Sequence, residues 1–386
     1  MAVALRLAER GLGSVWPNPA VGCVLVRGGR IVGRGWTQPG GRPHGEVEAL
    51  RRAGPSALGA TAYVSLEPCA HYGRTPPCTM ALLQAGIRRV VAATVDPDPR
   101  VNGRGIEQLR QAGVEVAVGL GGAEADAINA GFVLRVRAGR PLVTLKLATS
   151  LDGRIATRSG ASQWITGEQA RARGHLLRAS HDAIMIGSGT ALADDPSLTC
   201  RLPGLEDRSP VRVVLDRRLR LAPGSKLAVD ARAVPTWLFT GAAAPKRQRD
   251  ALAALGVDVQ VAGTDEGGRL DLREVLAALA ARGITRVLVE GGAELAAGLL
   301  RAHLVDRLAW FRGPVLLGGD GRAAIEALGI DAIAEALTAE PAGGALLARD
   351  RLERYIIEAG WEAPCSRESS ATSGGSSSSP RTTAGV

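Results

Sequence analysis

Lysine and aromatic residues are scarce in this sequence. Of its 47 basic residues only three are lysines, Lys146, Lys226 and Lys246, and the remainder are arginines scattered among alanine and glycine. The formal net charge of +9 by itself favours a nucleic-acid partner. Aromatic residues make up only 3% of the chain, however, which leaves few side chains for stacking on bases. We therefore expect an arginine-biased enzyme that acts on small anionic substrates and binds no nucleic acid.

Long apolar runs and paired cysteines are missing as well. No run of eighteen apolar residues occurs, so we expect no membrane-spanning segment and no membrane partner. The first ten residues lack the apolar centre and the small-residue cleavage site of a secretory signal. Five cysteines, an odd number, are not typical of a disulfide framework. These absences favour a cytoplasmic protein in which Cys69 and Cys78 serve metal or redox chemistry.

Residues 1–140 are expected to form a first α/β domain. The segments Val21–Val26 and Ile31–Trp36 flank Gly28-Gly29, a pattern that predicts a β-hairpin. Three later helical stretches each end on Ala-Gly, the usual helix stop, at Ala53-Gly54, Ala85-Gly86 and Ala112-Gly113. The strands between them are predicted at Ala62–Leu66, Val90–Val95 and Val114–Val118. This alternation predicts a three-layer α/β/α domain.

A second α/β domain is expected over residues 141–362, after a junction at Gly139-Arg140-Pro141. Its predicted strands are Leu142–Leu147, Ala183–Ile186, Val211–Leu215, Trp237–Thr240, Val257–Val261 and Val287–Glu290. Its predicted helices are Glu168–Ala179, Leu272–Ala281 and Ala293–Leu300. Residues 363–386 are rich in serine, threonine and glycine and should form a disordered tail, because they offer little apolar surface to bury.

Three potential zinc ligands stand near one acidic residue in the first domain. His44 and Glu46 lie two residues apart at the start of a predicted helix, Cys69 follows a predicted strand, and Cys78 opens the next helix. One imidazole and two thiolates suit Zn²⁺ and leave its fourth position to water. The positive end of a helix favours a thiolate, here at Cys78. The pattern predicts a catalytic site with Zn2+ as its cofactor.

The expected role of Glu46 is proton transfer. Zinc lowers the pKa of its bound water towards neutrality and so supplies a nucleophile for an amidine-type ring carbon. Glu46 would take the proton of that water and deliver it to the departing ammonia. A structural zinc site is the alternative, but such sites normally have four protein ligands. Here three are evident, and His71, only two residues from Cys69, is expected to contact substrate instead.

The ligand set is that of the zinc nucleobase deaminases, written H-x-E with P-C-x-x-C. The second cysteine lies further away in this chain, in the segment Pro68-Cys69-Ala70-His71-Tyr72-Gly73-Arg74-Thr75-Pro76-Pro77-Cys78. This segment closely resembles the bifunctional diaminohydroxyphosphoribosylaminopyrimidine deaminase/5-amino-6-(5-phosphoribosylamino)uracil reductase family of bacterial riboflavin biosynthesis. The resemblance extends to Pro17-Asn18-Pro19, Val21-Gly22-Cys23-Val24, Asp96-Pro97-Asp98-Pro99 and Gly103-Arg104-Gly105.

The resemblance implies roles for further residues of the first domain. Asn18, His71 and Arg74 would line the deaminase pocket. The family usually has alanine where this chain has Gly45. Glycine loosens the first turn of the helix by up to about 1 kcal/mol, and we expect activity to survive the change.

Two glycine turns stand out in the second domain. Gly187-Ser188-Gly189-Thr190 and Glu290-Gly291-Gly292-Ala293-Glu294 each follow a predicted strand. Such turns let a phosphate approach backbone N–H groups at a helix start, but many are turns and nothing more. No G-x-G-x-x-G follows the first strand, so a standard Rossmann domain is not supported.

The second domain resembles the family's reductase half, which is similar to dihydrofolate reductase in fold and uses NADPH. The resemblance lies in 145–153, 162–166 and 192–199. It implies that the residues facing the cofactor are Ala148, Trp164, Thr190, Asp194, Gly292, Ala293, Glu294, Leu295, Ala296, Ala297 and Gly298. It implies that the residues facing the substrate are Ser162, Arg178, Leu198, Arg201 and Glu290. Arginine suits the ribose 5-phosphate because its planar fork can bind two phosphate oxygens.

Lys146 and Glu290 are the ionisable residues expected to act in the reductase. The implied reaction is hydride transfer from NADPH to C1′ of the ribose, which gives a ribityl chain. The protein would position the nicotinamide and stabilise the open-chain sugar. For Lys146 a strand-end salt bridge is an equally good interpretation.

The favoured function is a two-step enzyme. It would deaminate 2,5-diamino-6-(5-phosphoribosylamino)pyrimidin-4(3H)-one and then reduce the sugar of the product, 5-amino-6-(5-phosphoribosylamino)uracil. We expect a homo-oligomer, which is common for such enzymes. A nucleic-acid deaminase of the tRNA type shares the zinc chemistry and would account for the positive charge, but it leaves the second domain unexplained. A zinc-stabilised scaffold without catalysis is the third possibility.

Overall fold

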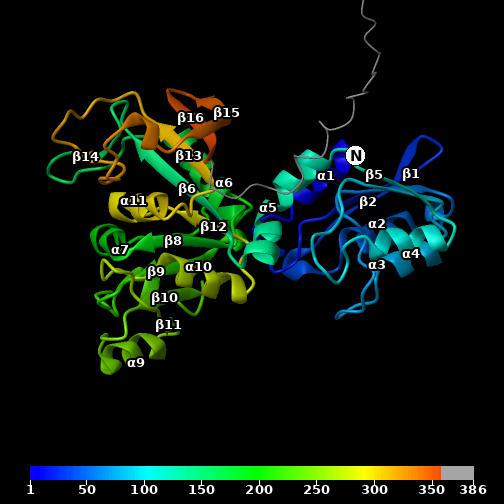
Figure 1. Ribbon diagram of the computed structural model, residues 1–386, viewed down its shortest axis with the longest axis horizontal. Coiled ribbons are helices and arrows are strands. Elements are labelled where there is room, and N and C mark those ends of the chain that lie inside the picture. The colour runs from blue at the N-terminus through cyan, green and yellow to red at the C-terminus, as the bar shows by residue number, and fades with distance from the viewer. Residues whose placement is uncertain (358–386) are drawn as a thin grey trace, which may run out of the picture.

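The computed structural model describes residues 1–357 and contains two main β-sheets (Figure 1). The five-stranded sheet belongs to the blue and cyan part of the chain on the right, and the nine-stranded sheet lies on the left. The helix α5 (Gly122–Ala138) stands between them. No helix of the described residues is long and apolar enough to cross a bilayer. The α/β architecture predicted from the sequence is confirmed.

The first sheet has the strand order β2-β1-β3-β4-β5. The order begins with antiparallel pairs, and β3, β4 and β5 are parallel. Its strands are β1 (Gly22–Arg27), β2 (Arg30–Trp36), β3 (Thr61–Val64), β4 (Arg89–Ala92) and β5 (Glu115–Val118). Its helices, besides α5, are α1 (Ala2–Glu9), α2 (Gly45–Ala53), α3 (Cys78–Gln84) and α4 (Arg104–Gln111). The predicted hairpin is β1-β2, which turns at Gly28 and Gly29 with φ of 55° and 74°.

Apolar side chains fill both faces of this sheet. Leu25 packs with Leu82 and Leu109 on the face that α2, α3 and α4 cover. Leu5 and Ile128 pack together on the other face, which α1 and α5 cover. The result is the predicted three-layer α/β/α domain. The predicted helix stops are also present, since Gly54, Gly86 and Gly113 follow helices with φ of 52°, 66° and 84°.

The second sheet has the order β11-β10-β9-β8-β12-β6-β13-β16-β15. All pairs from β11 to β13 are parallel, and β16 and β15 are added antiparallel. Its strands are β6 (Leu142–Thr149), β8 (Ala183–Gly187), β9 (Val211–Leu215), β10 (Thr236–Thr240), β11 (Asp258–Val261), β12 (Arg286–Val289), β13 (Arg307–Arg312), β15 (Ala339–Leu347) and β16 (Asp350–Ile357). A separate small sheet pairs β7 (Arg154–Ala156) with β14 (Arg322–Ala323).

Helices cover both faces of the parallel part. They are α6 (Glu168–Ala179), α7 (Ser188–Asp194), α8 (Lys226–Val229), α9 (Lys246–Ala254), α10 (Leu272–Ala281) and α11 (Ala293–Arg301). Residues 1–357 also contain four short 3₁₀ helices, Pro39–Gly41 and Gly54–Ala57 in the first domain and Glu206–Arg208 and Ile333–Glu335 in the second. One core cluster includes Val213 and Leu279, and a second, on the opposite face of the same sheet, includes Val214 and Leu252. The parallel strands carry apolar side chains on both faces of the sheet, because helices bury each of the two faces.

The elements that were not predicted include the helix α5 and the strand pair β15-β16, and also β13 and the helices α1, α7, α8 and α9. The buried residues of α5, such as Ala125, Asn129 and Leu134, point to several sides, because the helix packs between two bodies and has no single apolar face. The strand β15 contains a proline and two glycines and is exposed over nearly its whole length, so it carries no alternating pattern. The boundary between 140 and 141 stays a prediction, and the predicted tail at 363–386 lies outside the described residues.

Hydrogen bonds connect α5 to the segment before β1 on one side and to α10 and β12 on the other. The Asn129 amide donates to the carbonyl of Ala20 at 3.0 Å and accepts from its N–H at 2.9 Å. On the other side, the Arg286 guanidinium donates to the carbonyl of Ile128, and Arg135 Nε donates to the carbonyl of Ala280 at 2.8 Å. A Cβ on Gly131 would lie 2.3 Å from the carbonyl oxygen of Thr285. The junction therefore requires glycine at 131.

We predict that Gly131→Ala destabilises the protein by roughly 1–3 kcal/mol, since the backbone at Thr285 must move to admit the methyl group. Gly174→Ala in α6 is the matched control, because a Cβ there meets no atom within 4 Å. The control should gain up to about 1 kcal/mol from helix propensity. Urea unfolding of both variants measures the difference, and equal effects would contradict close packing at the junction.

Candidate functional site

Three donor atoms meet in the first domain, as predicted. His44 Nδ1 lies 3.2 Å from Cys78 Sγ and 3.6 Å from Cys69 Sγ, and the three donor atoms lie within 4.8 Å of one another. His44 precedes the first turn of α2, and Cys78 is the first residue of α3. Cys69 lies in the segment after β3. These donors suit zinc, and no fourth protein ligand joins the group among residues 1–357.

The two cysteine sulfurs interact with each other through a hydrogen bond. A hydrogen bond from the Cys78 thiol lowers the pKa of Cys69 to about 4. The same hydrogen bond, together with burial, raises the pKa of Cys78 well above its usual value. The backbone N–H of Cys78 also donates to Cys69 Sγ at 3.3 Å. The start of α3 therefore donates a backbone N–H to the sulfur of Cys69. That the helix start favours a thiolate at Cys78 stays a prediction, because a bound metal ion lowers the pKa of every thiol that ligates it.

Glu46 lies beside this group in the first turn of α2. Its side chain is 3% exposed, and its Oε2 atom has no hydrogen-bond partner. Burial raises the pKa of Glu46 to about 7. A carboxylate near neutrality can both take and give a proton at physiological pH. The orphaned oxygen fits a water held at the fourth position of a metal ion, so the residues present match a zinc site that keeps one position open.

Glu67 was missed by sequence reasoning, although it directly precedes Pro68-Cys69. Its carboxylate accepts four backbone N–H groups, from Asp96 at 3.1 Å, Gly103 at 2.9 Å, Gly105 at 2.8 Å and Ile106 at 3.2 Å. A Cβ on Gly105 would lie 2.0 Å from the carbonyl oxygen of Pro68. One buried carboxylate thus holds the 96–106 loop against the segment that carries Cys69. No motif marks a glutamate of this kind.

The three residues predicted to line the deaminase pocket differ in how far they are buried. Asn18 donates to the carbonyl of Gly41 at 2.8 Å, His71 has a buried Nδ1 atom without a partner, and Arg74 is exposed. Arg42 was missed, although it stands two residues before His44. Its guanidinium lies 3.5 Å from His44 Nε2 and donates to the hydroxyl of Thr75.

Gly45 is packed tightly at the start of α2. A Cβ at this position would lie 2.7 Å from the carbonyl oxygen of Val21. In this chain an alanine at 45 would therefore require the backbone to shift.

A buried ionic cluster forms the centre of the second domain. Arg178 donates to Glu290 through Nε at 2.8 Å and Nη2 at 3.0 Å, and Lys146 Nζ lies 3.5 Å from Glu290 Oε2. Burial by itself would raise the pKa of Glu290, but Lys146 and Arg178 outweigh it and lower the pKa to about 2. The Arg178 guanidinium also donates to the carbonyl of Thr199 at 3.0 Å.

The other predicted substrate residues lie around this cluster or at the surface. Arg201 donates to the Thr199 hydroxyl at 3.4 Å, and its backbone N–H donates to His175 Nδ1 at 3.3 Å. His175 was not singled out from the sequence. Leu198 is buried with φ of 56°, and Ser162 is exposed.

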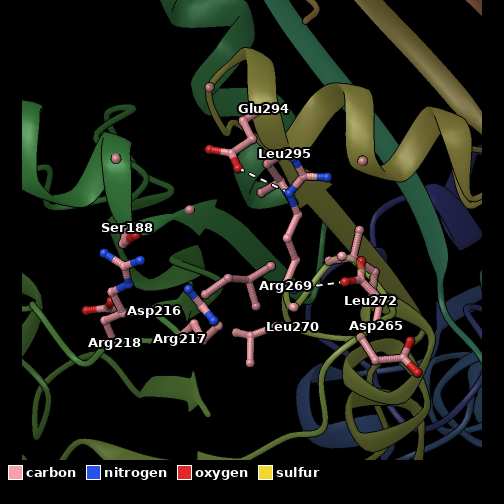
Figure 2. Close-up of a pocket in the computed structure, with 18 of the residues that line it drawn as sticks. Ser188, Asp216, Arg217, Arg218, Asp265, Arg269, Leu270, Leu272, Glu294 and Leu295 are labelled. Atoms are coloured by element: carbon pink, nitrogen blue, oxygen red, sulfur yellow. Dashed lines mark hydrogen bonds and ion pairs between the residues drawn. The ribbon is translucent and has the colours of Figure 1, made fainter. Parts of the chain in front are cut away.

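A cavity of about 730 Å³ opens beside α7 and α11 (Figure 2). Its walls come from the segments 187–190, 215–220, 265–273 and 292–302. The predicted cofactor residues that line it are Thr190, Gly292, Glu294, Leu295 and Gly298. The other predicted cofactor residues, which do not line it, are Ala148, Trp164, Asp194, Ala293, Ala296 and Ala297. Of these, Ala296 and Ala297 are fully buried and Trp164 is 68% exposed, with Arg171 stacked 4.4 Å from its ring. Both predicted glycine turns reach the cavity.

The class of protein is therefore a two-domain α/β enzyme, with a candidate metal centre in one domain and a cavity lined by two glycine turns in the other. Residues 1–94 match the family model for the cytidine and deoxycytidylate deaminase zinc-binding region, and residues 141–344 match the model for the RibD C-terminal domain. The "Riboflavin biosynthesis protein RibD" of Bacillus amyloliquefaciens is 46% identical over 83% of this chain and 85% of the relative. That of Escherichia coli is 44% identical over 87% and 92%.

Solved structures agree with these relatives. Acinetobacter baumannii RibD (form 1) superposes with a TM-score of 0.83 at 40% identity, over 92% of this chain and 97% of that chain. A Thermotoga maritima diaminohydroxyphosphoribosylaminopyrimidine deaminase/5-amino-6-(5-phosphoribosylamino)uracil reductase gives 0.80 at 34% identity, with the same coverage. The chain belongs to the RibD family. It is a bifunctional enzyme of riboflavin biosynthesis, with a zinc-dependent deaminase half and an NADPH-dependent reductase half.

We predict that Glu67→Gln lowers stability by about 2–4 kcal/mol, because an amide leaves buried backbone N–H groups without acceptors. The loosened segment should also retain less zinc. Glu107→Gln, an exposed change in α4, is the control and should alter neither property. Urea unfolding and metal analysis after dialysis test this. Unchanged stability and zinc content would show that Glu67 does not hold the loop.

We also predict a pH dependence for Glu290→Gln. The pKa of Glu290 is lower in the folded protein than its usual value, so the ionised carboxylate stabilises the fold above about pH 4, and this contribution is lost as the pH falls towards 2. The variant should be less stable by about 3 kcal/mol at pH 7. The difference in unfolding free energy between the wild type and the variant should shrink below pH 4. Urea unfolding at a series of pH values from 7 to 3 measures it. Glu326→Gln, an exposed control, should show no such trend.

Proposed function

We propose that the first domain deaminates 2,5-diamino-6-(5-phosphoribosylamino)pyrimidin-4(3H)-one with His44, Cys69 and Cys78 as zinc ligands. The support is the closeness of the three donor atoms beside a buried carboxylate. Bound zinc supplies an activated water. With zinc held there, Glu46 would take a proton from that water and pass it to the departing ammonia, a role for which a pKa of about 7 is well suited.

Asn18, His71 and Arg74 are proposed to bind the substrate of this step. His71 Nδ1 is buried and unpaired, so it can bond to a polar ring atom without first breaking another contact. Arg74 is exposed and makes no ion pair with a described residue, so its guanidinium can reach the 5-phosphate.

The second domain is proposed to reduce the sugar of the deaminated product. NADPH supplies the hydride when it is bound. Glu290 pairs with both Lys146 and Arg178 and so restricts the position of the Lys146 ammonium. In this proposal that ammonium delivers a proton to the sugar oxygen. Arg178 donates to the carbonyl of Thr199 and Arg201 to its hydroxyl, and these two neighbouring guanidinium groups are proposed to bind the 5-phosphate. Ser162 and Leu198 complete the proposed substrate side.

Location and assembly are proposals as well. A cytoplasmic homo-oligomer agrees with the small phosphorylated substrate and the use of NADPH. The tRNA-type deaminase is not favoured, because it gives no role to residues 141–344, which match a reductase-family model.

We predict that Glu46→Gln lowers ammonia release from the diaminopyrimidine nucleotide by at least about 100-fold. Zinc should stay bound, and NADPH oxidation with deaminated substrate should persist, because Lys146 and Glu290 lie in the other domain. Ammonia, zinc content and absorbance at the NADPH band are the three measurements.

Glu48→Gln is the matched control one half-turn further along α2. Glu48 pairs with Arg51 and Arg52 at 2.9 and 2.7 Å and has no contact with the donor atoms, so its loss should leave both reactions intact. Ammonia release at the wild-type rate from the Glu46 variant would contradict the proposed proton transfer. It would show that another base transfers the proton, whereas a protein that releases no ammonia even as the wild type would favour a zinc-stabilised scaffold.

A further inference from the structure

Residues 10–17 of the first domain lie against the second domain. This segment follows α1 and leads directly to Asn18, one of the residues proposed to bind the deaminase substrate. Three parts of the second domain contact it: the Arg208 side chain, the end of α6 and the turn between α10 and β12. The second domain therefore restricts a segment that ends at the deaminase site.

Arg208 makes the first of these contacts through its guanidinium group. It donates to the carbonyl of Arg10 at 3.1 Å and to the carbonyl of Leu12, just beyond the end of α1. It also donates to the Ser14 hydroxyl at 3.3 Å. Carbonyls at the end of a helix lack partners within the helix and carry partial negative charge, so a guanidinium is well placed there. One side chain of the second domain thus holds three groups of the first.

The other two contacts are close approaches of the backbone. A Cβ on Gly13 would lie 2.4 Å from the carbonyl oxygen of Ala179 at the end of α6. A Cβ on Gly283, in the turn between α10 and β12, would lie 2.9 Å from the Cβ of Pro17. Trp16 packs against the larger core cluster of the second domain. The segment is therefore held by the second domain along most of its length.

The same segment is tied to the deaminase pocket at its other end. The Ser14 carbonyl accepts the N–H of Gly40 at 2.8 Å, in the loop that leads to the metal ligands. The backbone N–H of Asn18 donates to the carbonyl of Val15 at 3.0 Å, and its side-chain amide donates to the carbonyl of Gly41 at 2.8 Å. The position of the Asn18 amide thus depends on turns that begin where the second domain holds the chain.

The Arg208 side chain takes no part in the reductase site. Within residues 1–357 its hydrogen bonds all go to the first domain. Other groups hold the reductase segment nearby: the Ser209 hydroxyl accepts the N–H of Cys200 at 3.1 Å, and Arg178 donates to the carbonyl of Thr199 at 3.0 Å. Loss of the Arg208 side chain should leave these contacts in place.

We propose that Arg208, a residue of the second domain, is a positioning residue for the deaminase reaction of the first. It holds residues 10–14, and through them the Asn18 amide, in the position that the substrate requires. The inference rests on the deaminase function and on the role of Asn18 proposed above. The second domain thereby completes the substrate pocket of the first.

The test compares Arg208→Met with the wild-type full-length protein. Methionine keeps an apolar stem but donates no hydrogen bond. The KM for the diaminopyrimidine nucleotide in ammonia release should rise about 10-fold, with kcat changed less than about two-fold, because substrate binding and not proton transfer is impaired. Zinc content and the KM for deaminated substrate in NADPH oxidation should not change.

A double variant tests whether Arg208 acts through Asn18. Asn18→Ala alone should raise the KM for the diaminopyrimidine nucleotide at least as much as Arg208→Met. Adding Arg208→Met to it should raise this KM little further, since no amide is left to be positioned. Fully multiplicative increases in the double variant, or an unchanged KM in Arg208→Met, would overturn the proposal.

Arg232→Met is the matched control, since Arg232 donates to the carbonyl of Ala254 at 3.0 Å, at the end of α9 and within the second domain. It should leave the KM of both reactions unchanged. Arg208→Lys keeps the charge and a donor, and its KM should lie between those of the wild type and Arg208→Met. The lysine variant also serves if the methionine variant does not fold, and a KM equal to that of the wild type would then count against the proposal.

Hydrogen exchange separates this proposal from the deaminase function itself. Backbone N–H groups of residues 11–18 should exchange faster in Arg208→Met than in the wild type, and at the wild-type rate in Arg232→Met. Unchanged exchange in Arg208→Met would overturn the proposal. If the wild-type protein released no ammonia from the nucleotide, the deaminase function would be overturned instead, and the exchange rates would still show whether Arg208 holds the segment.

Discussion

The deaminase half depends on three donor atoms from three separate segments that meet within 4.8 Å. The residue before α2, the segment after β3 and the first residue of α3 must each be placed correctly, because a displacement of any one opens the group. Two restraints act on this arrangement. The Glu67 carboxylate holds the segment next to Cys69, and the backbone N–H at the start of α3 donates to the Cys69 sulfur. The chemistry of Glu46 follows from the same packing, because burial at the start of α2 gives the carboxyl its raised pKa.

The two halves are built differently at their sites. The deaminase half offers one imidazole nitrogen and two sulfur atoms to a metal ion, whose charge would dominate the site. One buried carboxyl group, that of Glu46, lies beside them. The reductase half uses fixed cations around Glu290 and glycine turns that expose backbone N–H groups, an arrangement suited to phosphorylated molecules. The helix α5 joins them through Asn129 on one side and Arg286 on the other, so the two sites are held on one framework.

Local patterns in the sequence predicted most of the fold. The hairpin at Gly28-Gly29, the Ala-Gly helix ends and the apolar parallel strands all appear within a few residues of their predicted bounds. Elements without a local pattern were missed. The helix α5 is buried on several sides, and β15 has no alternation because it lies exposed at the sheet edge. The metal donors were predicted because their spacing is distinctive. Glu67 was not, since its importance depends on hydrogen bonds to a segment about forty residues away in the sequence.

The metal centre is tested most directly by X-ray absorption at the zinc edge on the purified full-length protein, together with its zinc content. The account predicts one zinc ion per chain, with two sulfur neighbours at about 2.3 Å and two nitrogen or oxygen neighbours at about 2.0 Å. Four sulfur neighbours, a shell without sulfur, or a protein that binds no zinc would contradict it.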